Sequence, residues 1–244
     1  MQSIVSVFLF SFFINCDPVP SELKELTDFI PKNPLVVLTI NDFEVLKSDL
    51  KNNSFLTELK DTQPYSYLKN KEVFNHLNPN SKIILCITEE NDTSSFTFIT
   101  KLNKGLFNLD SIPNKTIENI SFSSYTFQKV IINEQAIFTT IEDSIFIASN
   151  SQKVLEQVLS GNIENDAVFR KITTLSNHQD LTAIIPAHEI LINQTSLFNF
   201  ASWAALNIEV LPDAITASGV VLANDSVPQL IGVFKGLKPQ QNDI

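Results

Sequence analysis

Glycine is scarce in this chain, with only 5 among its 244 residues, whereas proteins average about 7%. Phosphate-cradling loops and the sharp turns that present a nucleophile both depend on glycine, because its backbone can approach a ligand closely. The sequence therefore argues against a nucleotide-binding loop. It also lacks the Gly-x-Ser-x-Gly motif of α/β-hydrolases.

Cysteine is nearly absent as well. The chain has two, Cys16 and Cys86, and if Cys16 carries lipid no intramolecular disulfide can form. Cys86 lies in the apolar run 83–87, which is typical of a buried strand, where a free cysteine packs as a small hydrophobe. A reactive thiol would need an exposed, electropositive setting. We therefore expect Cys86 to be a packing residue.

The three histidines show no spacing typical of metal ligands. They are His76, His178 and His188. The pair His188-Glu189 begins like a zinc-protease motif, but Ile192 stands where the second histidine is required. From the residues alone we predict no metal site, no cofactor and no catalytic residue.

Positive charge is in short supply. Lys and Arg number 17 against 27 Asp and Glu, which gives a formal net charge of -10. Nucleic-acid binding calls for clustered basic residues that neutralise phosphates. We therefore expect no nucleic-acid partner, and we interpret the thinly spread acid as a soluble, self-repelling surface.

A short hydrophobic run marks the N-terminus. Residues 4–14 are apolar apart from two serines, and the chain turns polar at 17–20. Such a run is too short to cross a bilayer comfortably and has the length of a signal-peptide core. The tetrapeptide ending at Cys16 resembles a loose lipobox, where signal peptidase cuts and the cysteine becomes the lipidated N-terminus. Asn15 stands where a small residue is usual, so an ordinary cleaved signal, an uncleaved anchor and a plain hydrophobic N-terminus stay open.

Apolar residues make up 43% of the chain and include 19 Phe, so a well-filled core is available. Hydrophobic periodicity and turn signals predict the elements along the chain. Predicted helices are 22–30, a segment capped by Asn41 or Asp42, 65–77, a segment from the cap at Asn150 or Ser151 to Gly161, 167–175 and 186–200. Predicted strands are 35–40, 82–88, 95–102, 123–133, 135–141, 144–150, 181–185, 203–210 and 214–223.

The order of these elements favours an α+β fold with a mostly antiparallel sheet, because strands come in runs between helices. We predict a lipoprotein-type signal peptide over 1–15, a tether over 16–21, one α+β half over 22–162 and a second over 163–244. Both halves contain a strand that feeds a helix, 35–40 and 181–185, which suggests a weak internal duplication.

Two further patterns are open to more than one interpretation. Trp203, the only tryptophan, lies near Phe198 and Phe200 and indicates either core between a helix end and a strand or a binding platform for sugar or peptide. Six Asn-x-Ser/Thr sites are either glycan acceptors or a consequence of composition; they are Asn52, Asn91, Asn114, Asn119, Asn193 and Asn224.

Several stretches resemble an uncharacterised family of bacterial envelope lipoproteins known as domain of unknown function 3352. The stretches are 29–33, 36–37, 40–42, 147–151, 200–206, 211–213, 218–219 and 234–236. The resemblance covers nearly all of the chain after the hydrophobic run and implies an envelope lipoprotein without established activity. Members of that family are often several times longer, which favours the alternative that this chain is the N-terminal part of a longer protein.

Some relatives in that family carry a ribonuclease label. Such chemistry would need a carboxylate cluster that holds Mg²⁺, opening here with a Gly-rich acidic motif. The nearest candidates are Asp42, Glu44 and Asp49, and their region contains no glycine. The residues do not support the label.

The leading hypothesis is a non-enzymatic cell-envelope lipoprotein, anchored to the membrane through Cys16, with a structural role or an envelope protein as partner. One alternative is an envelope hydrolase whose unrecognised site gathers several of four residues, Asp42, Glu44, His178 and His188. Another is the N-terminal fragment of a larger surface protein.

Overall fold

The computed structural model describes residues 24–58, 76–90, 93–161, 167–176, 180–187, 190–192, 196–198, 200–224, 226 and 228–236. The predicted lipidation residue Cys16 lies outside this part of the chain, and so does the helix predicted over 65–77 except for its last two residues.

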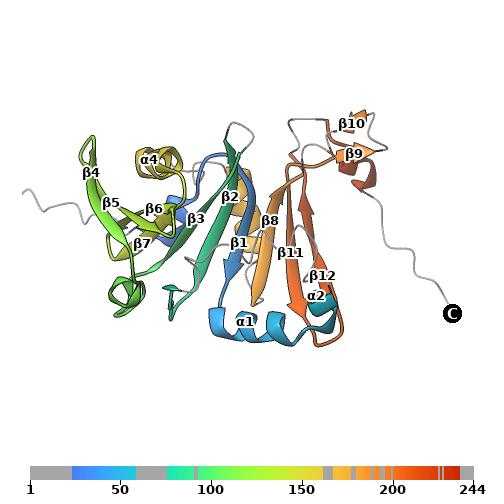
Figure 1. Ribbon diagram of the computed structural model, residues 1–244. Helices are drawn as coiled ribbons and strands as arrows, with labels where there is room; N and C mark the ends of the chain where they lie inside the picture. Colours follow the sequence, from blue (N-terminus) through green and yellow to red (C-terminus); the bar gives the residue numbers. More distant parts are fainter. Residues whose placement is uncertain are drawn as a thin grey trace, which may run out of the picture.

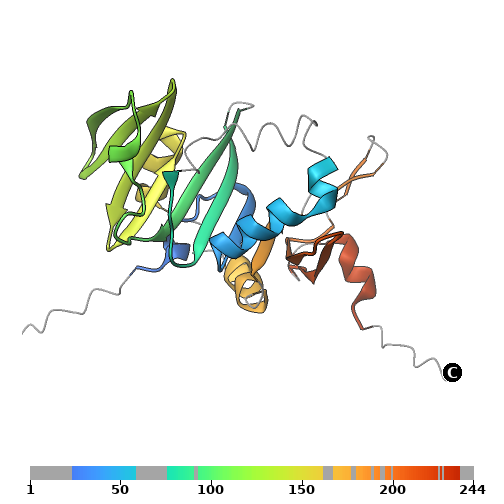
Figure 2. The same ribbon diagram turned by 60° about the horizontal axis from the view of Figure 1, so that its bottom comes forward.

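One twisted sheet of ten strands forms the body of the molecule (Figures 1 and 2), in the order β12-β11-β8-β1-β2-β3-β7-β6-β5-β4. Every neighbouring pair is antiparallel. The strands are β1 (Pro34–Ile40), β2 (Ile83–Glu90), β3 (Thr93–Lys101), β4 (Thr116–Phe122), β5 (Tyr125–Ile132), β6 (Gln135–Glu142), β7 (Ile145–Ser149), β8 (Leu181–Pro186), β11 (Trp203–Val210) and β12 (Ile215–Leu222). The α+β prediction is confirmed.

Helical segments cover both faces of this sheet. They are the 3₁₀ turns η1 (Leu26–Phe29), η4 (Leu109–Ser111) and η5 (Leu230–Phe234), and the helices α1 (Phe43–Asn52), α2 (Ser54–Glu58), α4 (Gln152–Ser160) and α5 (Ala167–Leu175). Their starts follow local chemistry: the Asp42 carboxylate accepts from the Val45 N–H at 2.9 Å, and the Ser151 hydroxyl accepts from the Val154 N–H at 3.3 Å. Gly161 follows α4, as predicted.

The sheet carries apolar side chains on both faces, which pack against η1, α4 and α5 on one side and against α1 and the segment 102–109 on the other. In β2, Ile84 and Cys86 belong to the core beneath η1, α4 and α5, whereas Ile83 belongs to the core on the opposite face beneath α1. Successive strand residues point to opposite faces, so a strand covered on both sides must be apolar throughout. This explains the unbroken run at 83–87.

Three elements differ from the sequence predictions. The helix predicted over 22–30 is, within the described residues, only the 3₁₀ turn η1. Strand β4 was not predicted at all. The helix predicted over 186–200 is instead the two-stranded hairpin of β9 (Ile190–Ile192) and β10 (Ser196–Phe198), which pairs antiparallel beside the main sheet. His188 lies outside the described residues.

The two halves of the chain meet at the β1–β8 pair, where Val37 lies opposite Ile184 and Leu38 opposite Ala183. From β1 the sheet continues through β2 and β3, and from β8 through β11 and β12. On each side of the β1–β8 pair, the next strands therefore follow one another in chain order toward the outside of the sheet. The internal duplication suggested by the sequence stays a prediction.

Candidate functional site

Asp42 and Glu44, the acidic candidates for a hydrolase site, are placed at the start of α1. The Asp42 carboxylate caps the helix, and Glu44 forms an ion pair with Lys47 at 3.8 Å in which both side chains are mostly exposed. Neither residue lines any of the three clefts described below. The histidines proposed to join them, His178 and His188, lie outside the described residues.

Trp203 is a core residue. It is buried on the face beneath α5, and its ring contacts Phe169 edge-on with centroids 5.0 Å apart. Of the two alternatives that the sequence left open, packing between a helix and a strand is therefore the one found. Phe200 is half-buried and packs against a separate apolar cluster that contains Ala201.

Cys86 is completely buried and forms no disulfide. Burial raises the pKa of its thiol far above the ordinary value, because an apolar setting disfavours the thiolate. The expectation of a packing residue is confirmed.

Within the described ranges, no three His, Cys, Asp or Glu side chains gather into a group that could hold a metal ion. Over the same ranges, no helix combines the length and the apolar composition that crossing a bilayer requires.

Strand β12 is an exposed edge of the ten-stranded sheet. Seven of its eight residues are exposed, including Ile215, Val220 and Val221. It pairs with β11 on one side and has no strand on the other among the described residues. Its sequence holds no charged residue and no proline, so it lacks two of the devices by which proteins protect an edge from pairing.

The opposite edge strand, β4, differs in its chemistry. Its centre carries Glu118, whose carboxylate forms an ion pair with Lys129 on β5 at 3.5 Å. A charge in the middle of an edge strand discourages the approach of another strand. The two edges of the sheet are thus unequal, and β12 is the more receptive of the two.

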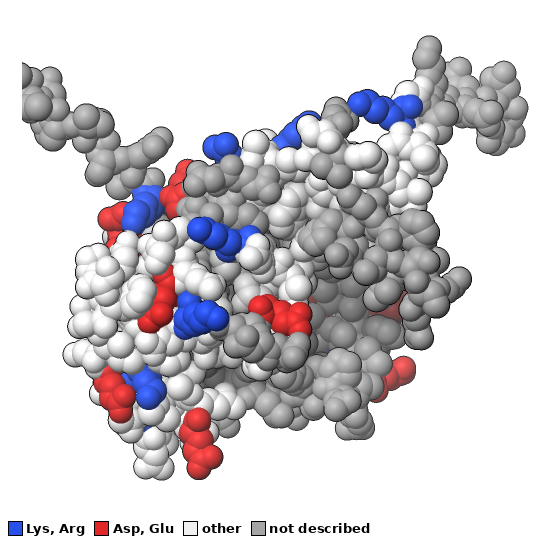
Figure 3. All heavy atoms as spheres, turned by 90° about the horizontal axis from the view of Figure 1, so that it is seen from above, with Lys and Arg blue, Asp and Glu red and all other residues white. Residues whose placement is uncertain are grey.

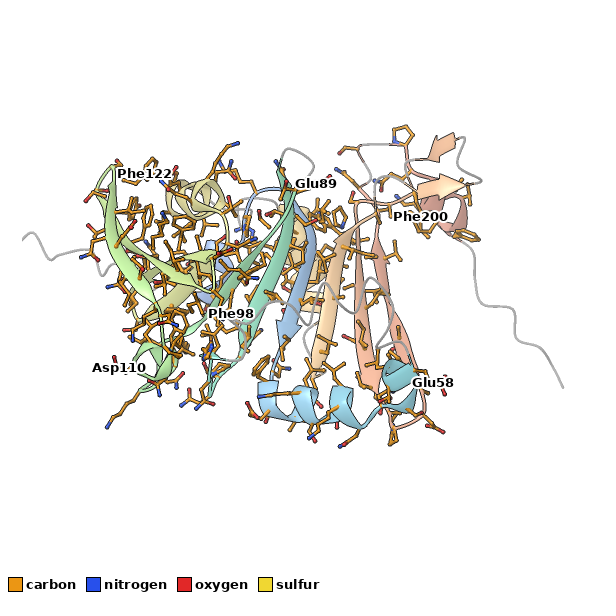
Figure 4. The ribbon with its side chains drawn as sticks, viewed as in Figure 1. Glu58, Glu89, Phe98, Asp110, Phe122 and Phe200 are labelled. Carbon is orange, nitrogen blue, oxygen red and sulfur yellow. The ribbon has the colours of Figure 1, made fainter. Side chains whose placement is uncertain are left out.

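The α4 cleft, of about 650 Å³, lies beside that helix and is lined by residues that include Lys32, Glu89, Lys153 and Glu156. The labelled Phe122 and Glu89 lie at the upper ends of β4 and β2, on the two sides of α4 (Figure 4). Viewed from above, basic and acidic side chains are interspersed over the described surface (Figure 3). The lining and the surroundings carry both signs of charge and do not select a ligand of one sign.

The α5 cleft, of about 590 Å³, lies between η1, β1, β2 and α5. Burial lowers the pKa of the Lys82 ammonium, and the nearby Glu25 carboxylate opposes this shift. The hydroxyls of Thr173 and Thr174 donate to carbonyls of their own helix, at 2.5 and 2.9 Å. These two hydroxyls therefore already donate hydrogen bonds within the helix. The cleft also contains both basic side chains, Lys82 and Arg170, and the acidic side chain of Glu25.

A third cleft, which we call the neutral cleft, has about 580 Å³ and lies between strands β4–β7 and the segment 102–109. None of the described residues that line it is ionisable. It combines aromatic and aliphatic side chains with amides and hydroxyls. The sequence analysis missed it because β4 was not predicted; the β-branched and aromatic residues Thr116, Ile117, Ile120 and Phe122 were the available signal.

Comparisons with known proteins give structural neighbours only. No protein-family model matches the chain, and no curated protein matches it. Three solved structures of TP0453 are similar to it. Crystal form III has a TM-score of 0.45 at 9% identity and covers 84% of this chain and 82% of that chain. Crystal form I has a TM-score of 0.45 at 7% identity, with 86% and 83% covered, and crystal form IV has 0.41 at 9% identity, with 75% and 74% covered.

Proposed function

We propose that this chain is a non-enzymatic cell-envelope lipoprotein, held to the membrane by lipid on Cys16, whose edge strand β12 binds an extended segment of another envelope protein. The observation that carries the binding role is the uncharged, exposed edge of the sheet. The anchor is supported by the hydrophobic run that ends shortly before Cys16.

Strand addition is what an edge of this kind does physically. In an antiparallel pair, hydrogen-bonded positions alternate with positions whose N–H and C=O groups point away from the partner. The Leu211 N–H donates to the Ala214 carbonyl at 2.9 Å, so the alternation directs the backbone groups of Ile215 and Ala217 outward. An added strand would use these groups for main-chain hydrogen bonds and would gain affinity from them.

The lipid anchor leads to a direct prediction. In cells that express the chain and are fed a clickable fatty acid, the wild-type protein should be labelled. Cys16→Ala should abolish the label, because lipid is transferred only to the cysteine of the lipobox. Cys86→Ala is the matched control and should label normally. Absence of label on the wild type, or label that persists in Cys16→Ala, would contradict the anchor and leave the role of β12 unaffected.

The edge strand is tested by site-specific cross-linking in the same cells. A photo-reactive phenylalanine at Ala217 of β12 should give a discrete adduct with another envelope protein. The same group at Ile117, which is exposed on the other edge strand β4, should give none. The purified partner should then bind the purified chain. Ala217→Pro should lose this binding, because proline removes an outward N–H and leaves the β11 pairing intact, whereas Ala217→Val should retain it.

Three results would overturn the role of β12. One is equal cross-linking from Ala217 and Ile117. The second is an adduct with a second copy of this chain alone. The third is a purified partner that binds Ala217→Pro as well as Ala217→Val, with both variants melting like the wild type.

A further inference from the structure

The neutral cleft has two chemically different walls, and one of them is a row of polar side chains across the sheet. Asn119 on β4 lies opposite Gln128 on β5, and Gln128 lies opposite Thr139 on β6. All three residues line the cleft. Adjacent strands are about 4.8 Å apart, so this row presents two amides and a hydroxyl at regular intervals. Each of these groups can both donate and accept a hydrogen bond.

The other wall is apolar. Leu106 and Phe107 come from the segment 102–109, and Phe146 from β7, with the two aromatic rings edge-to-face at 6.0 Å. At the rim, Ile141 is 53% exposed and Leu102 is 45% exposed. These side chains offer an apolar surface that faces the solvent within reach of a ligand in the cleft.

Asn103 fixes the segment that carries Leu106 and Phe107. Its side-chain nitrogen donates to the carbonyls of Asn78 and Lys104 at 3.2 and 3.3 Å. Its side-chain oxygen is closed off from solvent and has no hydrogen-bond partner among the described residues. A ligand in the cleft therefore cannot reach this oxygen, and Asn103 contributes by tying the segment 102–109 to Asn78.

The lining narrows the class of ligand. An ionised group would lose its hydration and find no charged partner among these residues. A purely apolar chain would cover Asn119 and Gln128 and leave their amides unpaired. A saccharide ring satisfies both walls, since its hydroxyl edge hydrogen-bonds to amides while its C–H face packs on apolar side chains. The volume of about 580 Å³ lies within the usual range of small-molecule sites.

We propose that the neutral cleft binds an uncharged saccharide, with Gln128 and Asn119 as its main hydrogen-bonding residues. This proposal is independent of the partner at β12, because the cleft is built from β4–β7 at the other end of the sheet order. It would stand even if the edge strand had no partner.

The test is titration of the purified, isotope-labelled chain with defined sugars, followed by amide chemical shifts and calorimetry. The neutral probes are maltotriose, cellotriose and diacetylchitobiose, and the acidic probe is digalacturonic acid. At least one neutral probe should saturate below roughly 10 mM, as weak sugar sites do, with shifts confined to β4–β7 and 102–109. Gln128→Ala and Asn119→Ala should each weaken this binding about tenfold, which corresponds to one lost hydrogen bond.

Ser121→Ala is the matched control. Ser121 is exposed on the same strand and face as Asn119 but does not line the cleft, so its removal should leave the affinity unchanged. The proposal fails if no neutral probe saturates, if digalacturonic acid binds as well as the neutral sugars, or if Gln128→Ala and Ser121→Ala bind alike. It also fails if decanol, and no sugar, binds and Ile141→Asn abolishes that binding, because the cleft would then take an apolar chain.

Discussion

Replacing Gly219 with alanine is expected to separate β12 from β11 and to destabilise the protein by about 3 kcal/mol. Gly219 lies opposite Leu206 in the β11–β12 pair. A Cβ added there would overlap the carbonyl oxygen of Ala205 and lie 3.0 Å from the Cα of Leu206. Both neighbours are backbone, so no side chain can turn away to make room. The strand itself has to move, and its hydrogen bonds to β11 are lost with it.

The measurement is the urea midpoint and the melting temperature, which should fall by roughly 6–12 °C for a chain of this size. Gly232→Ala is the matched control, because a Cβ at Gly232 in η5 would meet nothing within 4 Å. At such a position, alanine reduces the entropy of the unfolded chain and stabilises slightly. The same Gly→Ala substitution should therefore lower the stability at position 219 and raise it slightly at position 232. A Gly219→Ala protein that melts with the wild type would contradict the close approach of the two strands.

The local pattern of the sequence predicts most of the sheet. Strands β1, β2 and β7 are runs rich in β-branched and aromatic residues, and each was placed within a few residues of its observed bounds. The hairpin at 190–198 was misread as a helix because its apolar residues are seven apart, which is two helical turns. In the structure Leu191 pairs with Leu197, six residues further along, so these apolar residues belong to two antiparallel strands and not to one face of a helix.

The candidate surfaces depend on the strand order, which a single sequence does not contain. Strand 214–223 was predicted correctly, but only the order of the ten strands shows that it is an edge. The neutral cleft likewise requires β7, β6, β5 and β4 to be neighbours in the sheet and the segment 102–109 to pack against them. Each of its polar residues is ordinary on its own, and the row from Asn119 to Thr139 appears only when the strands are paired.

Asn53 has the second large expected effect, because one buried side chain joins two distant parts of the chain. It is completely buried between α1 and α2. Its side-chain oxygen accepts from the Leu56 N–H at 2.8 Å, and its side-chain nitrogen donates to the carbonyls of Leu211 and Ala214 in the β11–β12 turn. In the sequence this residue was only a break between two helical stretches.

Asn53→Ala should therefore destabilise the protein by about 3 kcal/mol, since it removes a helix cap and takes the side-chain donor away from the half-buried Leu211 and Ala214 carbonyls. Asn52→Ala is the matched control. The exposed Asn52 makes one long hydrogen bond to Ser48, at 3.4 Å, so its loss should cost less than about 0.5 kcal/mol. Equal urea midpoints for the two variants would show that Asn53 does not hold the turn.

Asn53→Asp tests the two functions of the side chain separately. The carboxylate can still accept from the Leu56 N–H, but it cannot donate to the Leu211 and Ala214 carbonyls and faces their oxygens instead. Desolvation and those carbonyl oxygens disfavour the charged form, so the pKa of the new carboxyl should be raised in the folded state. The folded protein then binds more protons than the unfolded one, and its stability relative to the wild type rises as the pH falls. Urea unfolding at pH 7 and at pH 4 should show the deficit of Asn53→Asp shrinking at the lower pH, while that of Asn53→Ala stays constant. A deficit of Asn53→Asp that does not change with pH would mean that its carboxyl reaches solvent, and the link between α2 and the β11–β12 turn would then be looser than the structure describes.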